Sequence, residues 1–102
     1  QWFVRMESFA KHLREIVIQG KTRLIPEHWD STYFHWIDNL RDWCISRQLW
    51  WGHRIPIWYH REDSNRLICY DGPDIPEEVK QNPQDWIQDS DVLDTWFSSA
   101  LW

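Results

Sequence analysis

Two stretches in the first half of the chain place apolar residues at helical spacing. The first, within residues 7–19, is formed by Phe9, Leu13, Ile16 and Val17. The second, within residues 27–40, is formed by Trp29, Tyr33, Trp36, Ile37 and Leu40. A recurrence of this kind predicts one apolar face on each of two helices. Gly20 favours an end to the first helix, and Pro26 suits the start of the second.

After residue 40 the apolar residues gather in short runs, at 43–45, 55–59 and 67–70. Runs of this length predict a small, irregular β portion. Pro56 donates no backbone hydrogen bond, so the second run is expected to be an edge or irregular strand. The polar residues 60–66 predict a long hairpin loop between the last two runs.

Residues 71–91 hold three of the five prolines and many acidic residues, and they predict a surface excursion with one helical turn at 76–81. The fold class is therefore α/β, with two helices. A chain of 102 residues is about one small domain long. We expect a single partial domain: a helical segment over 1–41, then 42–102 with a surface hairpin and loop at 60–91.

Ten tryptophans are unusual in a chain of this length, and core or interface packing is the favoured interpretation. The chain begins at Gln1 without an initiator methionine and ends on the apolar residues 100–102, so we expect a piece of a longer protein.

The formal charge of −5 argues against a free-standing module whose affinity comes from the nucleic-acid backbone. No apolar run is long enough to span a bilayer, and no signal segment opens the chain, so no membrane partner is expected. Cys44 and Cys69 lack the close spacing of metal-ligand pairs, which favours free thiols in a reducing compartment, the cytoplasm.

Four residues have side chains that zinc accepts, namely Cys44, His53, His60 and Cys69. No two of them lie close in sequence, so no metal site is predicted. The apolar neighbours of Cys44 disfavour a reactive thiolate.

Among the acidic residues Asp89, Asp91 and Asp94, a solvated loop is favoured over a catalytic carboxylate pair. Asp94 differs because its neighbours are apolar, and its carboxylate therefore needs a hydrogen-bonding or cationic partner.

Residues 47–54 mix basic and aromatic side chains in a way that suits stacking on bases or sugars. Packing is the favoured interpretation of Trp50 and Trp51, and a stacking surface stays open. A non-catalytic, aromatic-rich binding module for sugars or single-stranded RNA is the alternative function.

Three stretches resemble the motifs of class I valyl-tRNA synthetases, in the family's order: QWFVRM at 1–6, DWCISRQLWWGHRIP at 42–56 and DVLDTWFSSALW at 91–102. The SRQ and WG patterns are shared with the isoleucine and leucine relatives. The double tryptophan before GHRIP, and the TWFSSALW stretch, are specific to the valine enzymes. The first stretch is similar to the segment that leaves the family's editing insertion.

The resemblance implies a fragment of a Rossmann-like catalytic domain. It also implies a parent ligase that activates valine with ATP and magnesium and passes the valyl group to tRNA(Val). The parent is expected to be a cytoplasmic monomer, with the remainder of the same polypeptide as a further partner. The HIGH-like and KMSKS-like signatures that bind ATP in this family do not occur in the chain. We therefore expect no cofactor in the fragment, no catalytic residue and no activation of valine by the fragment alone.

By the same resemblance, Trp96 forms a wall of the valine side-chain pocket, and Trp102 is a second candidate for that pocket. The motif residues expected to position the site rather than to react are Arg47, Gln48, Trp50, Trp51 and Asp94.

Overall fold

A computed structural model describes all 102 residues, and they form two compact units. Unit 1 comprises Gln1–Ile45 and unit 2 comprises Ser46–Trp102. Helices and strands occur in both, which confirms the α/β class. Every strand pair is antiparallel. None of the helices combines the length and apolar character that crossing a bilayer requires.

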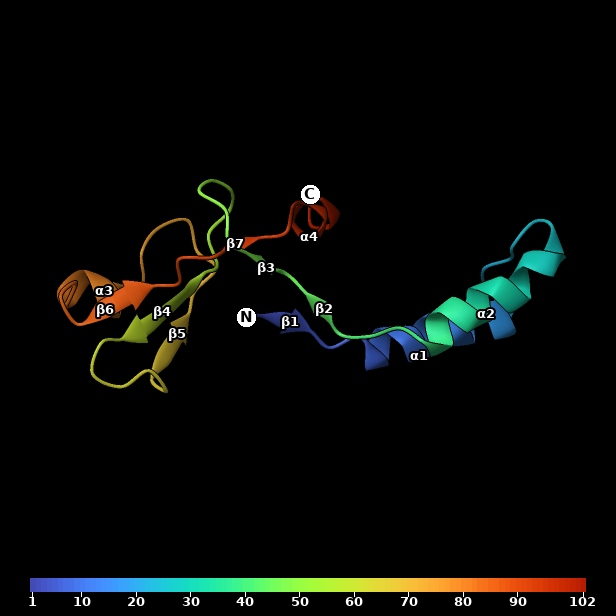
Figure 1. Cartoon of the computed structure of the whole chain (residues 1–102), viewed down its shortest axis with the longest axis horizontal. Coiled ribbons are helices and arrows are strands. Elements are labelled where there is room, and N and C mark those ends of the chain that lie inside the picture. The colour runs from blue at the N-terminus through green and yellow to red at the C-terminus, as the bar shows by residue number, and fades with distance from the viewer. The chain divides into compact units, whose positions relative to one another are not determined.

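Unit 1 is a helical hairpin joined to a short two-stranded ribbon (Figure 1). Its elements are β1 (Phe3–Val4), α1 (Glu7–Ile18), the 3₁₀ turn η1 (Glu27–Trp29), α2 (Asp30–Asp38) and β2 (Trp43–Cys44). Both predicted helices are confirmed. Gly20 lies just beyond α1 with a φ of 72°, a left-handed conformation that glycine adopts without steric cost.

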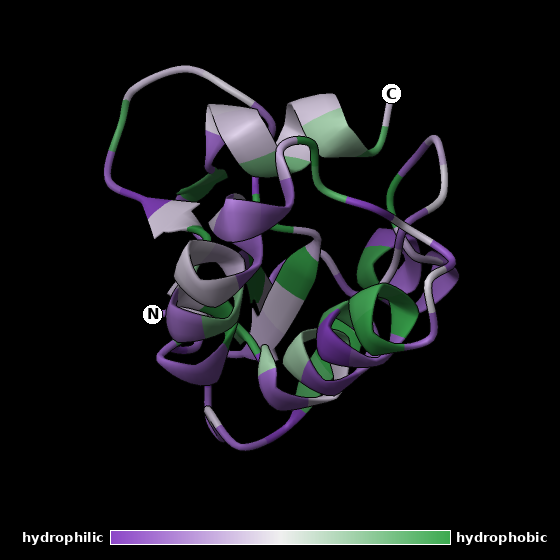
Figure 2. Cartoon of the chain, turned by 90° about the vertical axis from the view of Figure 1, so that its right-hand side faces the viewer, coloured by the Kyte–Doolittle hydropathy of each residue, from purple (hydrophilic) through white to green (hydrophobic).

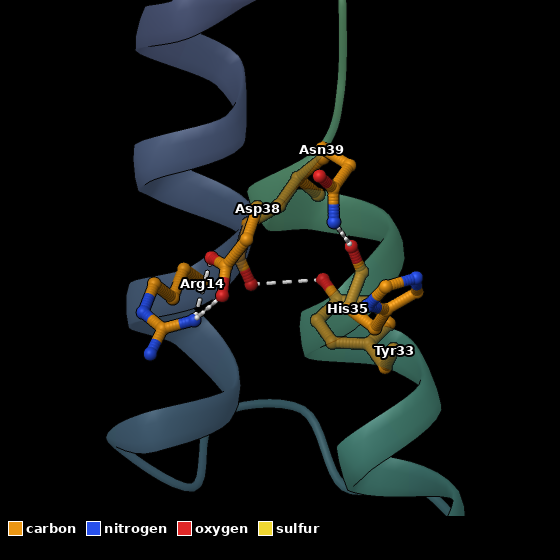
Figure 3. A network of polar contacts seen from close by, with 6 residues as sticks. Arg14, Tyr33, His35, Asp38 and Asn39 are labelled. Carbon is orange, nitrogen blue, oxygen red and sulfur yellow. Dashed lines mark hydrogen bonds and ion pairs between the residues drawn. The ribbon is translucent and has the colours of Figure 1, made fainter.

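Polar contacts fasten α1 to α2 (Figure 3). The Arg14 guanidinium donates through Nη1 to both carboxylate oxygens of Asp38, at 2.7 and 2.9 Å. The Tyr33 hydroxyl donates to the Leu13 carbonyl at 2.8 Å. The Arg14 guanidinium also lies over the Phe34 ring, 4.8 Å from its centroid. These directional polar contacts help to set how the two helices pair.

Each predicted apolar stripe, within 7–19 and within 27–40, includes residues that lie outside the contact between α1 and α2. Leu13, Ile16 and Val17 are half-buried, whereas Phe9 is exposed. In the second helical segment Trp29 and Trp36 are exposed, so their predicted place on a packed face is wrong within unit 1. A two-helix hairpin covers one narrow strip of each helix. Hydrophobic and hydrophilic residues both occur along the helical ribbons (Figure 2).

Unit 2 contains two small sheets and two short helices. Its elements are β3 (Ser46–Arg47), β4 (Ile57–His60), β5 (Leu67–Cys69), α3 (Glu77–Gln81), β6 (Trp86–Gln88), β7 (Val92–Leu93) and α4 (Thr95–Ala100). One sheet pairs β3 with β7, and the other has the order β5-β4-β6. The hairpin predicted around residues 60–66 is confirmed by the pairing of β4 with β5.

β4 is the central strand of its sheet, so the prediction of an edge or irregular strand is wrong. The reason lies in the position of Pro56. It precedes β4 instead of lying in it, and its carbonyl accepts a hydrogen bond from the Tyr70 backbone N–H at 3.0 Å. The missing N–H of Pro56 therefore removes nothing from the ladder on either side of the strand.

The small core of unit 2 consists of Trp58, Val79 and Trp86. The last two belong to the predicted surface excursion at 71–91. The helical turn predicted at 76–81 is confirmed as α3, whereas the burial of Val79 and the strand β6 that holds Trp86 correct the expectation of a segment on the surface. Trp86 is 6% exposed. The His60 ring meets it edge-on at 5.1 Å, and the Arg66 guanidinium lies 5.4 Å from its centroid.

Replacing Trp86 by alanine should open a cavity in this core. Truncation of a buried aromatic residue costs about 3–5 kcal/mol. Amide exchange in β4 and β6 should accelerate roughly 100- to 5000-fold, measured by hydrogen–deuterium exchange. Trp50→Ala is the control because Trp50 is 96% exposed, and it should leave these amides unchanged. Equal exchange in both variants would contradict the core assignment.

An exposed ion pair joins α3 to the residues that precede it. Lys80 Nζ lies 2.7 Å from Asp74 Oδ2. The hydrogen bond from Lys80, followed by that of the Ile75 backbone, lowers the pKa of the Asp74 carboxyl. The hydrogen bond to Asp74 raises the pKa of the Lys80 ammonium. The lowered carboxyl pKa stabilises the fold above the pKa of an unfolded aspartate, and this contribution is lost as pH falls through the folded pKa.

Lys80→Gln should raise the pKa of the Asp74 carboxyl towards its ordinary value of 3.8. A carboxyl-detected NMR titration measures the shift. Lys11→Gln in unit 1 is the control and should leave the Asp74 titration as it is. An Asp74 titration curve identical in the Lys80 variant and the native protein would show that the pair does not form in solution.

Candidate functional site

The two most specific sequence motifs, at 42–56 and 91–102, meet in unit 2 through the pairing of β3 with β7. Ser46 lies opposite Leu93, and Arg47 lies opposite Val92. At the end of this ribbon Arg47 Nη2 lies 2.6 Å from Asp94 Oδ2. The pairing therefore brings together two of the predicted positioning residues, although they are 47 positions apart in the sequence.

The loop that follows β3 is held along the other side of β7. The Leu93 N–H donates to the His53 carbonyl at 2.7 Å, and the Ile55 N–H donates to the Asp91 carbonyl at 3.0 Å. The Arg54 guanidinium donates to the Asp89 carbonyl at 2.9 and 3.2 Å and to the Gln88 carbonyl at 3.1 Å. These contacts fix both ends of the segment between β6 and β7.

Gly52 allows the loop to pass close to β7. Its φ is 137°, a conformation that side chains with a Cβ rarely adopt. A Cβ at this position would lie 3.2 Å from Val92 Cγ2 and 3.3 Å from Val92 Cβ. Both the backbone angle and the approach to Val92 therefore require glycine.

The residues just before Gly52 project away from the unit. Gln48, Trp50 and Trp51 are exposed, so the favoured packing interpretation of the two tryptophans is wrong within unit 2. The physical reason is the turn at Gly52, because the backbone there, and not the indoles, packs on Val92. The indole rings of Trp50 and Trp51 are therefore accessible to other contacts.

Asp94 has the partners that its apolar surroundings required. Its Oδ1 accepts from the Trp96 backbone N–H at 2.8 Å, which caps the N-terminus of α4, and its Oδ2 pairs with Arg47. The expectation of a hydrogen-bonding or cationic partner is confirmed. Helix α4 itself was not predicted. Its sequence signal is an aspartate placed directly before the helix, a preferred N-cap residue.

The two predicted pocket residues are both exposed, at opposite ends of α4. Trp96 is 78% exposed, with its backbone in the first turn. Trp102 follows the helix and borders an open hollow of about 280 Å³. The other residues that border this hollow are His53, Leu93, Thr95, Ser98 and Ser99. Trp96 does not border this hollow, so the hollow contains only one of the two predicted pocket residues.

The remaining candidates are the two cysteines, the possible metal ligands and Asp89. Both cysteines are free thiols, with Cys44 half-buried and Cys69 exposed. No three side chains among the histidines, cysteines and acidic residues are grouped to hold a metal ion. Asp89 accepts from the Tyr59 hydroxyl at 2.9 Å and from the Asp91 N–H at 2.9 Å, so it organises a turn.

Gly52→Ala should loosen the contact between the loop and β7. A strained backbone conformation costs about 1–3 kcal/mol. The Leu93 and Ile55 amides should exchange roughly 10- to 100-fold faster, measured by hydrogen–deuterium exchange. Gly20→Ala is a matched control, because Gly20 also has a positive φ but nothing lies within 4 Å of its Cβ position. Unchanged exchange at Leu93 in the Gly52 variant would contradict the close approach.

Comparison with known proteins gives a match over the whole chain. The model of the family described as tRNA synthetases class I (I, L, M and V) matches residues 1–102. A valine–tRNA ligase of Protochlamydia amoebophila is 78% identical over 102 residues, which cover 100% of this chain and 11% of the relative. Similar ligases of Chlamydia caviae and Chlamydia felis are 61% and 60% identical, with the same coverage. The chain thus spans 11% of the length of these curated relatives.

Proposed function

The chain belongs to the class I tRNA synthetases (I, L, M and V), and from this premise we propose that it is part of a valine–tRNA ligase. The observation that carries the proposal is the 78% identity to a valine–tRNA ligase along the entire chain. The comparisons give no support to the alternative of a non-catalytic, aromatic-rich binding module.

The proposed parent enzyme converts valine and ATP to valyl-adenylate and then transfers the valyl group to the terminal adenosine of tRNA(Val). Magnesium accompanies the ATP. The HIGH-like and KMSKS-like signatures that serve ATP in this family are not among these residues. We assign the chain to the amino-acid pocket and to the connection between the editing insertion and the catalytic domain, with 1–41 following that insertion.

Trp96 is the residue we propose as a wall of the valine side-chain pocket. Its exposure within unit 2 leaves the indole face available to a ligand. A rigid indole limits the volume of a pocket, and one methylene more or less in such a pocket changes binding by about 1–3 kcal/mol. Valine enzymes are a standard illustration of the limit this sets: it is too little to reject threonine, so a separate editing site is needed.

Trp102 is the second proposed pocket residue, and its support is its place at the hollow beside Thr95 and Ser98. We further propose that the parent is a cytoplasmic monomer and that valine, ATP and tRNA(Val) are its substrates. The exposed indoles of Trp50 and Trp51 are then surfaces for the remainder of the same polypeptide.

Trp96→Ala in the full-length ligase that carries this chain should raise the KM for valine. We expect kcat/KM for valine to fall roughly 10- to 100-fold, with the KM for ATP unchanged, because only the valine pocket loses a wall. Valine-dependent ATP–pyrophosphate exchange measures both constants. Trp36→Ala is the control, since Trp36 is also an exposed helical tryptophan and belongs to unit 1.

Two outcomes would contradict these assignments separately. An unchanged valine KM and rate in the Trp96 variant would remove Trp96 from the pocket. A full-length native protein that exchanges pyrophosphate with another amino acid but not with valine would overturn the proposed specificity.

A further inference from the structure

Helix α4 cannot set its own direction. It has six residues, Thr95–Ala100, and helices of that length are marginal in water without an external anchor. None of its residues is buried. The contacts of its first turn therefore contribute to the direction in which it presents Trp96.

Asp94 holds that first turn through two acceptor atoms and pairs with Arg47 through a third. Its backbone carbonyl accepts from the Ser98 N–H at 3.1 Å. Its carboxylate accepts from the Trp96 N–H through Oδ1 and pairs with Arg47 through Oδ2. Since one planar carboxylate serves both contacts, a rotation that keeps the cap also needs Arg47 to move.

Arg47 is in turn tied to a buried part of unit 2. It ends β3, opposite Val92, which is 3% exposed. Its guanidinium also donates through Nη1 to the Ser46 carbonyl at 2.8 Å. The Asp94 side chain is 13% exposed against 39% for Arg47, so water screens this pair less than Arg14–Asp38 and Lys80–Asp74, whose side chains are all at least 43% exposed.

We propose that Arg47 and Asp94 are positioning residues for valine recognition: their ion pair fixes the first turn of α4 on the β3–β7 ribbon and thereby fixes the place of the Trp96 indole. The proposal rests on the proposed function, because it assumes that Trp96 contacts valine. Neither residue needs to touch the substrate. A displacement of about 1 Å at a site is enough to cost on the order of 100-fold in rate.

The test separates the ion pair from the helix cap in the full-length ligase. Asp94→Asn keeps a side-chain oxygen that caps a helix but loses the charge, and Arg47→Gln removes the partner. Each should raise the valine KM roughly 10- to 100-fold. The double variant should show about the same increase as either single variant, because both remove the same interaction. Arg47→Lys keeps the positive charge and should recover part of the affinity.

A further measurement distinguishes positioning from a merely structural role. A displaced Trp96 changes the shape of the pocket, so the ratio of kcat/KM for valine to that for threonine should fall while the KM for ATP stays the same. Simple loss of folded enzyme lowers the number of active sites, determined by active-site titration, and leaves the KM values and this ratio unchanged. Arg61→Gln is the control for removal of an exposed arginine elsewhere in unit 2.

The result that overturns the proposal is a native valine KM and a native discrimination ratio in both Asp94→Asn and Arg47→Gln, while Trp96→Ala impairs valine binding. Independent, additive effects of the two substitutions would also overturn it. Failure of the Trp96 assignment has another signature, because Trp96→Ala would then leave the valine KM unchanged as well. Failure of the proposed function would appear in the native protein itself, as pyrophosphate exchange with another amino acid but not with valine.

Discussion

The segment from Gln88 to Asp94 links most of the elements of unit 2, because it hydrogen-bonds to β3, to the loop after β3, to β4 and to α4. Its backbone carbonyls accept hydrogen bonds from the Arg54 guanidinium and the Ile55 N–H, and its Leu93 N–H donates to the His53 carbonyl. Its N-terminal end joins the β4 sheet, where the Asp89 N–H donates to the Ile57 carbonyl at 2.8 Å. Its last residue caps α4. Short strands are weak alone, and here one segment links two of them to a helix.

Apolar burial alone does not account for such an arrangement. No large side chain in the chain is fully buried. The most buried apolar residues are Ile55 and Val92, which lie where the loop after β3 meets β7. Polar contacts consequently define the geometry: Arg14 with Asp38 in unit 1, and Arg47 with Asp94 in unit 2. Such contacts are directional, so they restrict the orientation of the elements they join.

The sequence predicted the elements whose signals are local. The periodic stripes gave both helices of unit 1, and the turn-rich residues 60–66 gave the hairpin. The errors came from pairings between distant residues. Nothing local to Trp86 indicates that it joins β4, and Pro56 has a different meaning before a strand than within one. Burial of aromatic residues depends on such pairings, so composition could not tell Trp58 from Trp50.

The candidate site shows the same division. The need of Asp94 for a partner could be read from its apolar neighbours, but the identity of that partner required the register of β3 and β7. The tightness of the loop at Gly52 likewise depends on Val92, 40 positions away. Family resemblance supplied the roles of the tryptophans, and the structure supplied the contacts that could place them.

The residues that anchor α4 differ from the residue whose side chain α4 exposes. Asp94 and Arg47 hold the first turn, whereas the indole of Trp96 makes none of those contacts through its ring. Position 96 can therefore be varied while the anchoring pair is kept constant. The anchor and the exposed indole thus lie on different elements, since Arg47 belongs to β3 and Trp96 to α4.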